Sequence, residues 1–244
     1  MIAPNLAILA RGVCKEFGSG PQRTPVLQGA GLGIARGEVV FLVGPSGSGK
    51  TTLLSILGCI LTPDGGSVQV LNQEVAQLRP AELAAFRQRH LGYVFQTFNL
   101  FPTLSALDNV ALAATMRGVA LPTARAQAER LLEQVGLSRQ GRLRPGQLST
   151  GGCQRVAVAR GLVNDPAILF ADEPTASLDA ANGQAVMELL TRLVKAHGVT
   201  LVVVTHDSRI LSFANRILHL EHGRLIRATQ PGEAAQRATL ESVA

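Results

Sequence analysis

The order of apolar and polar residues divides the chain into strand-like and helix-like segments. Residues 4–43 predict strands, because residues 6–13 alternate loosely and residues 39–43 form a continuous apolar run. A helix is expected from residue 53 onward, and a short strand is expected over residues 67–71. The first third of the chain therefore predicts strands with a helix among them.

The rest of the chain passes through a helical stretch and then alternates again. Helical spacing rich in Ala and Leu runs from about residue 105 to residue 137, and residues 149–163 also predict a helix. The remaining expected elements are a strand at 167–171, a helix at 180–197 and strands at 200–204, 216–220 and 224–227. This order predicts an α/β domain interrupted by a helical insertion.

The composition is that of a folded domain. Hydrophobic residues make up 46% of the 244 positions, which excludes a disordered chain and suffices for a core. The most apolar stretches, residues 38–44 and 199–205, are far shorter than the roughly 20 residues of a membrane-spanning helix. No secretory signal is expected at the start, and the widely spaced Cys14, Cys59 and Cys153 predict reduced thiols in the cytosol.

The net charge of +6 allows two interpretations. A basic surplus can favour nucleic acid or anionic lipid, or it can be an ordinary solvated surface. Only three of the 23 basic residues are lysines, and aromatic residues make up only 4% of the chain. The second interpretation is favoured, because the chain offers little material for stacking bases.

Residues 44–51 fit the pattern Gly-x-x-x-x-Gly-Lys-Thr of a phosphate-binding loop, with a strand before it and a helix after it. Glycines let backbone N–H groups curl around a phosphate, and the helix N-terminus adds positive charge. Lys50 is expected to reach the β- and γ-phosphates and stabilise the transferring charge, and Thr51 to offer its hydroxyl to Mg²⁺. The residues predicted to hold the nucleotide are Gly44, Pro45, Ser46, Gly47, Ser48, Gly49, Lys50, Thr51 and Thr52.

Two carboxylates follow the apolar run at residues 168–171. Asp172 at the strand end can hold Mg²⁺ through water, and Glu173 can polarise a water for attack on the γ-phosphate. The structural alternative is that this pair caps the helix expected from residue 180. His206 also ends an apolar strand, where a side chain points toward the ligand crevice of a parallel sheet. Gln96, after another apolar run, is unremarkable by itself.

Taken in order, these motifs resemble one family, the nucleotide-binding subunits of ABC transporters. The order is the phosphate-binding loop, Gln96, Leu-Ser-Thr-Gly-Gly-Cys-Gln-Arg at 148–155, Asp172-Glu173, Ser-Leu-Asp at 177–179, and His206. The resemblance runs from about residue 6 to residue 228. The segment at 148–152 is its most diagnostic part, because other P-loop classes lack it.

The resemblance implies a single ABC ATPase domain over residues 1–244. Its fold would be a P-loop NTPase (RecA-like) α/β core with an antiparallel β-subdomain and an inserted α-helical subdomain. Residues 1–95 and 160–228 are expected to form the nucleotide-binding core and residues 96–159 the helical subdomain with the signature segment. Residues 229–244 are expected to form a loosely held tail.

The resemblance also implies roles around bound ATP and Mg²⁺. Phe17 is expected to stack on adenine, and Gln96 to contact Mg²⁺ and water and to sense the membrane partner. Asp172 is implied as a metal ligand together with Thr51 and Gln96. Glu173 is implied as the catalytic base and His206 as the switch residue at the γ-phosphate.

A second copy of the chain is implied to complete each site. Ser149 and Gly151 are expected to hold the γ-phosphate of ATP bound to the opposite copy, and Asp179 lies in the dimer-contacting loop. The segment departs from the Leu-Ser-Gly-Gly-Gln pattern, since Thr150 replaces the first glycine and Gly152 replaces the glutamine. The effect of this departure on the hydrolysis rate is left open.

The sequence beside these motifs narrows the resemblance. Residues 44–58, 62–66 and 93–110 look like the LolD- and MacB-like ATPases, which work with permeases of the FtsX/MacB type. This implies a peripheral homodimer on the cytoplasmic face of the inner membrane. It would drive a separate permease for export or extraction of a substrate such as a lipoprotein or a small amphiphile.

The apolar cluster after Gln96 has two interpretations. Phe98, Leu100, Phe101 and Leu104 form either a docking patch for a permease helix or ordinary packing of the helical subdomain. Two further functions are kept as alternatives. An FtsE-like subunit would control a periplasmic enzyme through its permease, and a soluble ATPase stimulated by nucleic acid is favoured only by the net charge.

Overall fold

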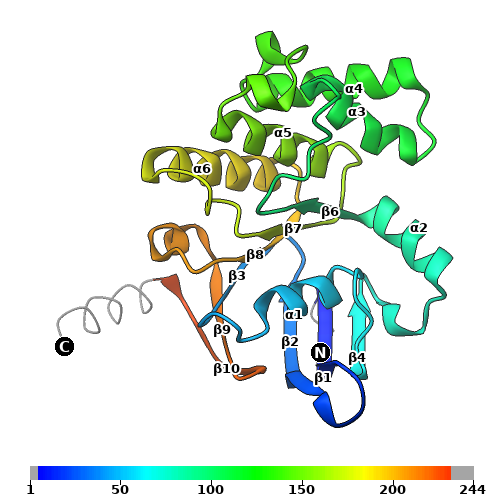
Figure 1. The fold of residues 1–244 in the computed structure, drawn as a ribbon, viewed down its shortest axis with the longest axis vertical. Helices are drawn as coiled ribbons and strands as arrows, with labels where there is room; N and C mark the ends of the chain where they lie inside the picture. The colour runs from blue at the N-terminus through cyan, green and yellow to red at the C-terminus, as the bar shows by residue number, and fades with distance from the viewer. Residues whose placement is uncertain (1–4, 232–244) are drawn as a thin grey trace. The chain divides into compact units, whose positions relative to one another are not determined.

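The computed structural model describes residues 5–231, and its helices and strands follow the predicted order (Figure 1). The chain forms two compact units, one of Met1–Ala84 with Thr200–Ala244 and the other of Ala85–Val199. No helix among residues 5–231 is both long enough and apolar enough to cross a bilayer. The α/β class with an antiparallel sheet is confirmed, whereas the predicted tail falls largely outside the described residues.

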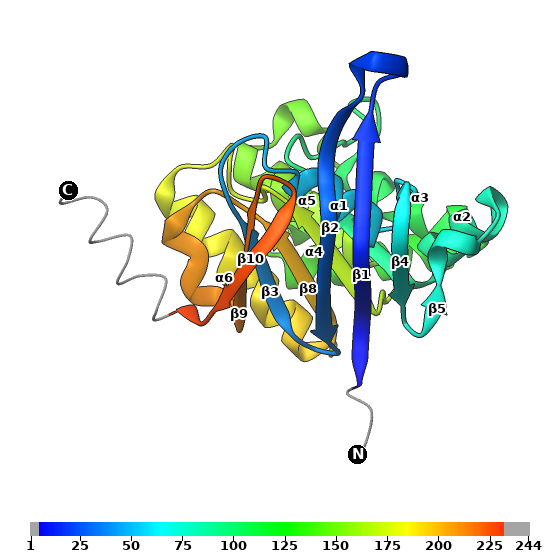
Figure 2. The ribbon, with the colours of Figure 1, turned by 90° about the horizontal axis from the view of Figure 1, so that it is seen from below.

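The first unit contains an antiparallel sheet. Its order is β2 (Thr24–Ala35), β1 (Leu6–Phe17), β4 (Gly65–Val70) and β5 (Gln73–Glu74), as Figure 2 shows. The register of β1 against β2 shifts at several points, and such bulges bend and twist a long strand pair. Within residues 6–13, Ala7, Ile8, Ala10 and Val13 are buried, and the register against β2 shifts between Ala10 and Val13, so the alternation along the strand is loose.

The same unit contains a group of buried strands that run parallel. The strand β3 (Val39–Val43) lies between β8 (Thr200–Val204) and β9 (Arg216–Glu221), and β10 (Arg224–Thr229) pairs antiparallel with β9. All five residues of β8 are buried. Continuous apolar runs such as these are typical of parallel strands covered on both faces.

Side chains fix where these strands begin. Arg216 donates to both carboxylate oxygens of Glu38, at 2.7 and 3.0 Å, and to the Gly33 carbonyl. The Asn215 amide oxygen accepts from the Val39 N–H at 2.8 Å. These bonds hold the start of β9 beside the start of β3, so that both strands end near the loop that follows β3.

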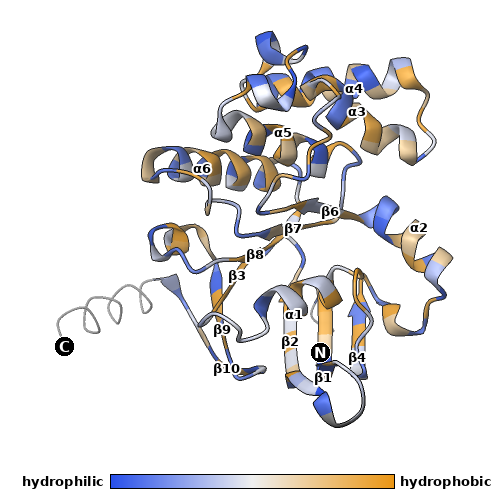
Figure 3. Cartoon of the chain, in the orientation of Figure 1, coloured by the Kyte–Doolittle hydropathy of each residue, from blue (hydrophilic) through white to orange (hydrophobic). Residues whose placement is uncertain are grey.

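The second unit contains one parallel strand pair and most of the helices. The strands β6 (Leu91–Val94) and β7 (Ile168–Asp172) pair in parallel, with Val94 opposite Ala171. The helices α3 (Ala106–Met116), α4 (Leu121–Gln134) and α5 (Thr150–Leu162) pack against one another. The helix α6 (Ala180–Ala196) has one apolar and one polar face, which Figure 3 shows as alternating colours.

Some elements were not predicted. The helix α2 (Pro80–His90) buries no residue, so its sequence carries no apolar periodicity. The 3₁₀ turns at Gly20–Gln22, Val75–Gln77, Ser138–Gln140, Pro145–Gln147 and Ser208–Phe213 are short and equally without a pattern. The remaining helix, α1, spans Lys50–Leu57 and begins directly after the glycine-rich loop.

The strand β6 packs against α5 at a point where only glycine fits. A Cβ on Gly92 would lie 2.1 Å from the carbonyl oxygen of Gly161 and 2.8 Å from a methyl of Leu169. We expect G92A to lower the free energy of unfolding by about 2–3 kcal/mol, because backbone atoms would have to move. Urea unfolding followed by circular dichroism measures this change.

The matched control is G146A. Gly146 lies in a 3₁₀ turn, and a Cβ there would meet nothing within 4 Å. Its unfolding midpoint should stay close to that of the parent chain. Equal midpoints for G92A and G146A would show that the close contact at Gly92 does not limit stability.

Candidate functional site

The glycine-rich loop curls between β3 and α1. Gly44 has φ of 154°, and a Cβ at this position would lie 2.0 Å from the Leu220 carbonyl oxygen. Gly49 has φ of 99° and is the N-cap of α1, which no side chain caps. The first turn of α1 therefore presents its N–H groups to the loop, as an anion-binding helix start requires.

Lys50 is held over this loop. Its side chain is nearly buried, and Nζ donates to the carbonyl oxygens of Gly44 and Pro45 at 2.9 and 2.8 Å. The hydroxyl of Ser48 is also buried, and it has no hydrogen-bond partner among residues 5–231. A fixed ammonium and an unpaired buried hydroxyl are typical of a loop that is built around a polar ligand. These residues therefore fit a nucleotide phosphate.

Two further predicted residues lie in the same unit. His206 is exposed in the turn after β8, and this turn is fixed by Thr205 Oγ1 accepting from the Asp207 N–H at 3.0 Å. Phe17 at the end of β1 is 43% exposed, and the Lys15 ammonium lies 5.7 Å from its ring centroid. Both side chains are accessible, and their implied roles stay predictions.

In the second unit, three predicted polar residues follow the strands of the β6–β7 pair at one edge. Asp172 ends β7, and Gln96 follows β6 by two positions. Because β6 and β7 run parallel, both residues lie at the carboxyl end of the pair. Glu173 comes next with φ of 48°, a left-handed conformation that is uncommon outside glycine and asparagine. Such strain is concentrated at functional sites.

A magnesium site here would depend on the nucleotide. Among the described residues, no group of three or more His, Cys, Asp or Glu side chains is gathered to hold a metal. Mg²⁺ is usually held by one or two protein oxygens together with substrate phosphates and water. The hydroxyl of Thr51 in the first unit and the carboxylate of Asp172 in the second are each oxygen donors of a kind that suits Mg²⁺ beside a phosphate, and their joint role stays a prediction.

The signature segment starts α5 in an ordered way. Ser149 is the N-cap of α5, and its hydroxyl accepts from the Gly152 N–H at 3.1 Å. Thr150 is thus the first residue of the helix. A Cβ on Gly151 would lie 3.6 Å from the Asn182 amide oxygen, so the starts of α5 and α6 are neighbours. Despite Thr150, this segment retains the free N–H groups of a helix start.

Asp179 caps α6, and this corrects one alternative from the sequence. Its carboxylate accepts from the Asn182 N–H at 2.9 Å and from the Asn182 side-chain amide. The backbone bond and then the side-chain bond lower the pKa of Asp179. The N-cap of α6 is therefore Asp179, and Asp172 and Glu173 do not cap this helix.

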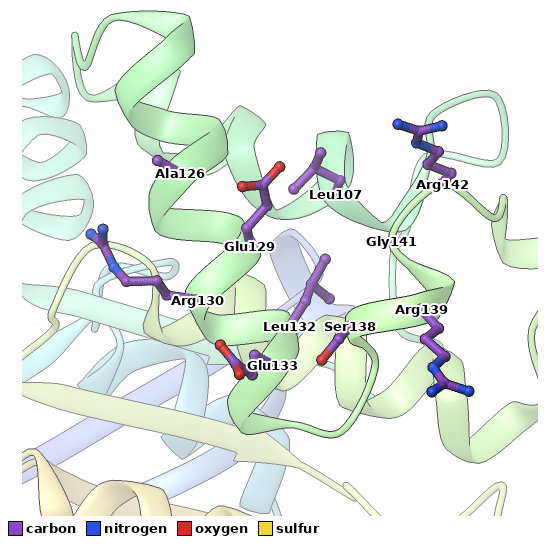
Figure 4. A pocket seen from close by; sticks show the side chains of 10 residues that line it. All are labelled: Leu107, Ala126, Glu129, Arg130, Leu132, Glu133, Ser138, Arg139, Gly141 and Arg142. Carbon is purple, nitrogen blue, oxygen red and sulfur yellow. The ribbon is translucent and has the colours of Figure 1, made fainter.

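Two pockets open in the second unit. The larger, of about 650 Å³, is lined by residues of α3, α4 and 138–142, among them Glu129, Arg130 and Arg139 (Figure 4). None of its lining residues is a predicted site residue. The smaller, of about 360 Å³, includes Gly151 and Asn182 and therefore lies beside the signature segment.

The structure also shows two polar residues that the sequence did not single out. Asn109 of α3 is fully buried, and its amide bonds to both the N–H and the carbonyl of Phe101. Arg160 of α5 donates to the carbonyl oxygens of Phe98 and Asn99. The only sequence signal for these two residues was a polar side chain within an apolar helical run, and this signal does not show which backbone groups the side chain binds.

Of the four apolar residues after Gln96, Phe101 is a large residue that is 51% exposed.

Taken together, the strand, glycine-rich loop and helix of the first unit define a nucleotide-binding protein of the P-loop type. Residues 27–176 match the family model described as ABC transporter. The chain belongs to the ABC transporter family. The predicted P-loop NTPase fold is confirmed by this match and by the solved structures below.

Relatives in two groups are similar over most of the chain. The macrolide export ATP-binding/permease protein MacB of Neisseria gonorrhoeae is 43% identical over 222 residues, which is 91% of this chain. The chain spans about a third (34%) of the length of that relative. The lipoprotein-releasing system ATP-binding protein LolD of Bordetella pertussis is 47% identical over 219 residues, 90% of this chain and 95% of LolD.

Solved structures agree in fold. The ATP-binding cassette MJ0796, solved as a dimer in a post-hydrolysis state bound to ADP and Pi, has a TM-score of 0.85 and 38% identity. The alignment covers 92% of this chain and 98% of that one. The protein cbiO1 of Clostridium perfringens, part of the ABC transporter complex cbiONQ, has a TM-score of 0.86 and 27% identity, covering 98% of this chain and 94% of that chain.

The position of the Lys50 ammonium makes nucleotide affinity testable. We expect K50M to raise the Kd for ATP with Mg²⁺ by about tenfold or more, because a charged hydrogen-bond donor to the phosphates is lost. Isothermal titration calorimetry measures the Kd. K195M, which removes an exposed lysine from the last turn of α6, is the control and should bind as the parent chain does. Equal affinities for the two variants would contradict a role of Lys50 in holding ATP.

Proposed function

We propose that this chain is the ATP-binding and ATP-hydrolysing subunit of an ABC transporter complex. The observation that supports this most is the glycine-rich loop with Lys50 held over it, in a chain of this family. Lys50 and the first turn of α1 would bind the phosphates, and Thr51, Asp172 and Gln96 would hold Mg²⁺. The metal supplies charge neutralisation at the phosphates when it is bound.

The chemistry proposed for this chain is activation of a water molecule. Glu173 would accept a proton from the water that attacks the γ-phosphate. Its left-handed backbone conformation sets the direction in which the side chain leaves the main chain. His206 would contact the γ-phosphate, and Lys50 would stabilise the charge that develops on it. Phe17, which is exposed at the end of β1, would stack on adenine.

We propose further that two copies enclose two ATP molecules. The signature segment supports this, because the start of α5 offers N–H groups to an anion while its own chain already has a phosphate-binding loop. Ser149 and Gly151 would bind the γ-phosphate held by the partner copy, with Asp179 beside them. MJ0796, similar in fold and sequence, is a dimer in its solved structures.

The partner of this dimer would be a membrane permease of the FtsX/MacB type. The names of the similar proteins support this proposal, since MacB is an ATP-binding/permease protein and LolD belongs to a lipoprotein-releasing system. The chain would then act at the cytoplasmic face of the inner membrane. Its exposed Phe101 would lie in the surface that docks the permease, and the substrate class would be a lipoprotein or a small amphiphile.

The dimer is tested with E173Q. Removing the catalytic base should leave ATP bound and unhydrolysed, so the protein should elute as a dimer with ATP and Mg²⁺ and as a monomer without them. Size-exclusion chromatography with light scattering measures the mass. The double variant K50M/E173Q should stay monomeric. A monomer for E173Q at saturating ATP would count against the two-copy site.

The permease is tested by co-purification. We expect tagged E173Q, extracted from membranes in mild detergent with ATP and Mg²⁺, to retain a permease with few spanning helices and a large extracytoplasmic domain. Mass spectrometry identifies what is retained, and the same extraction without ATP is the control. A many-helix permease would overturn the FtsX/MacB type but keep the ATPase. An active ATPase with no membrane partner would favour the nucleic-acid alternative.

A further inference from the structure

One arginine connects the last turn of α5 to the loop that follows Gln96. Arg160 lies on α5, and one terminal nitrogen donates to the Phe98 carbonyl oxygen at 2.6 Å while the other donates to the Asn99 carbonyl oxygen. The planar fork of arginine places two donors side by side, so it can hold two neighbouring carbonyls at once. A lysine ammonium is a compact charge on a flexible stem and lacks the fixed side-by-side spacing of two guanidinium donors.

The loop is shaped to present those two carbonyls. Phe98 and Asn99 both have left-handed backbones, with φ of 60° and 49°. Two consecutive left-handed residues that are not glycine are strained, and such strain persists only where surrounding contacts fix it. The Thr97 hydroxyl donates to the Asn99 side chain at 2.9 Å and supports the same turn. The conformation of the loop and the fork of Arg160 therefore depend on each other.

The far half of the loop is tied to α3. The buried Asn109 amide accepts from the Phe101 N–H at 2.7 Å and donates to the carbonyls of Phe101, Leu104 and Ser105 at 3.0 to 3.2 Å. Phe101, between these two attachments, is 51% exposed. The exposed ring therefore sits on a backbone held from both sides, by α3 and by α5.

The partial burial of Arg160 makes its attachment costly to break. Its side chain is half-buried, and this burial lowers the pKa of the guanidinium. If the loop moved away alone, a charged group would lose its carbonyl partners in a poorly hydrated place. Moving the loop and α5 together avoids this penalty. At 1.5 Å per residue, Arg160 lies about 15 Å along the same helix from Thr150.

We propose that Arg160 is a positioning residue that links the exposed loop Phe98–Phe101 to the signature segment at the start of α5. A displacement of the loop by a docked partner would pass through Arg160 and shift Ser149 and Gly151 against the second ATP. Closure of the dimer would shift the loop in return. This inference rests on the proposed two-copy ATPase, but it assigns a residue that touches neither nucleotide nor partner.

The kinetic test compares R160K with R117K. Arg117 also donates to a backbone carbonyl, that of Asn164 just after α5, at 2.8 Å, so the two substitutions are chemically matched. We expect R160K to lower kcat about tenfold with KM for ATP changed less than about twofold, because the phosphate-binding loop is untouched. R117K should leave both within about twofold of the parent. Equal kinetics for the two variants, or a matching rise in KM for R160K, would overturn the proposal.

A spectroscopic test observes the loop directly. The chain has no tryptophan, so F101W provides a single tryptophan, at the exposed position, whose emission can be excited apart from that of Tyr93. In the E173Q background, ATP with Mg²⁺ should change the emission of F101W as the dimer forms. Adding R117K should preserve this change, and adding R160K should abolish it while light scattering still detects the dimer.

The outcomes separate the two proposals. A dimer that forms in R160K with an unaltered emission change would overturn the link through Arg160 and leave the proposed function intact. A dimer that forms in the parent without any emission change would overturn the link as well. Absence of the dimer from every variant would instead overturn the proposed function, and the link would fall with it.

Discussion

The structure depends on backbone segments that approach each other too closely for any side chain. At the start of the phosphate-binding loop, Gly44 lies against the carbonyl of Leu220 at the end of β9. In the other unit, Gly92 of β6 lies against the carbonyl of Gly161 in α5. The first contact holds the start of the phosphate-binding loop against the end of β9, and the second holds β6 against α5. The glycine-rich loop follows β3 and Gln96 follows β6, so their placement depends on these contacts.

Helix starts provide the second constraint. The helix α1 begins at a glycine without a side-chain cap, whereas α5 and α6 begin at Ser149 and Asp179, whose side chains each accept one N–H. In a capped helix, the side chain of the N-cap residue fixes the first turn, but it also occupies one of the N–H groups that could bind an anion. The uncapped start of α1 therefore has all its first N–H groups available for a phosphate bound to its own chain. The capped start of α5 has fewer available, which suits a contact with the phosphate bound to a second copy. This difference is consistent with the roles proposed for the two segments.

Much of the fold was readable from the sequence, because its strands are buried on one or both faces and its long helices have one apolar face. The helix α2 was not predicted from the sequence, because none of its residues is buried and its polar surface therefore leaves no periodic pattern of apolar residues. Of the candidate site, the common edge of Gln96 and Asp172 follows from parallel pairing of two apolar runs. Arg160 and Asn109 could not be found in this way, because their partners are backbone carbonyls of a loop whose conformation is set only in three dimensions. The role of Glu173 came from its place at the strand end together with the resemblance, the switch role of His206 came from the resemblance, and both stay predictions.

The doubly attached loop around Phe101 also bears on how fast and how tightly a partner can bind. A flexible loop loses conformational entropy when a partner orders it, and this loss weakens the complex. Here the left-handed turn at Phe98 and Asn99 and the amide of Asn109 have already fixed the backbone. An aromatic ring on a backbone that is already fixed can enter a pocket with a smaller loss of conformational entropy. The same rigidity would narrow the range of partner surfaces that fit, so the proposed docking on this loop would be selective.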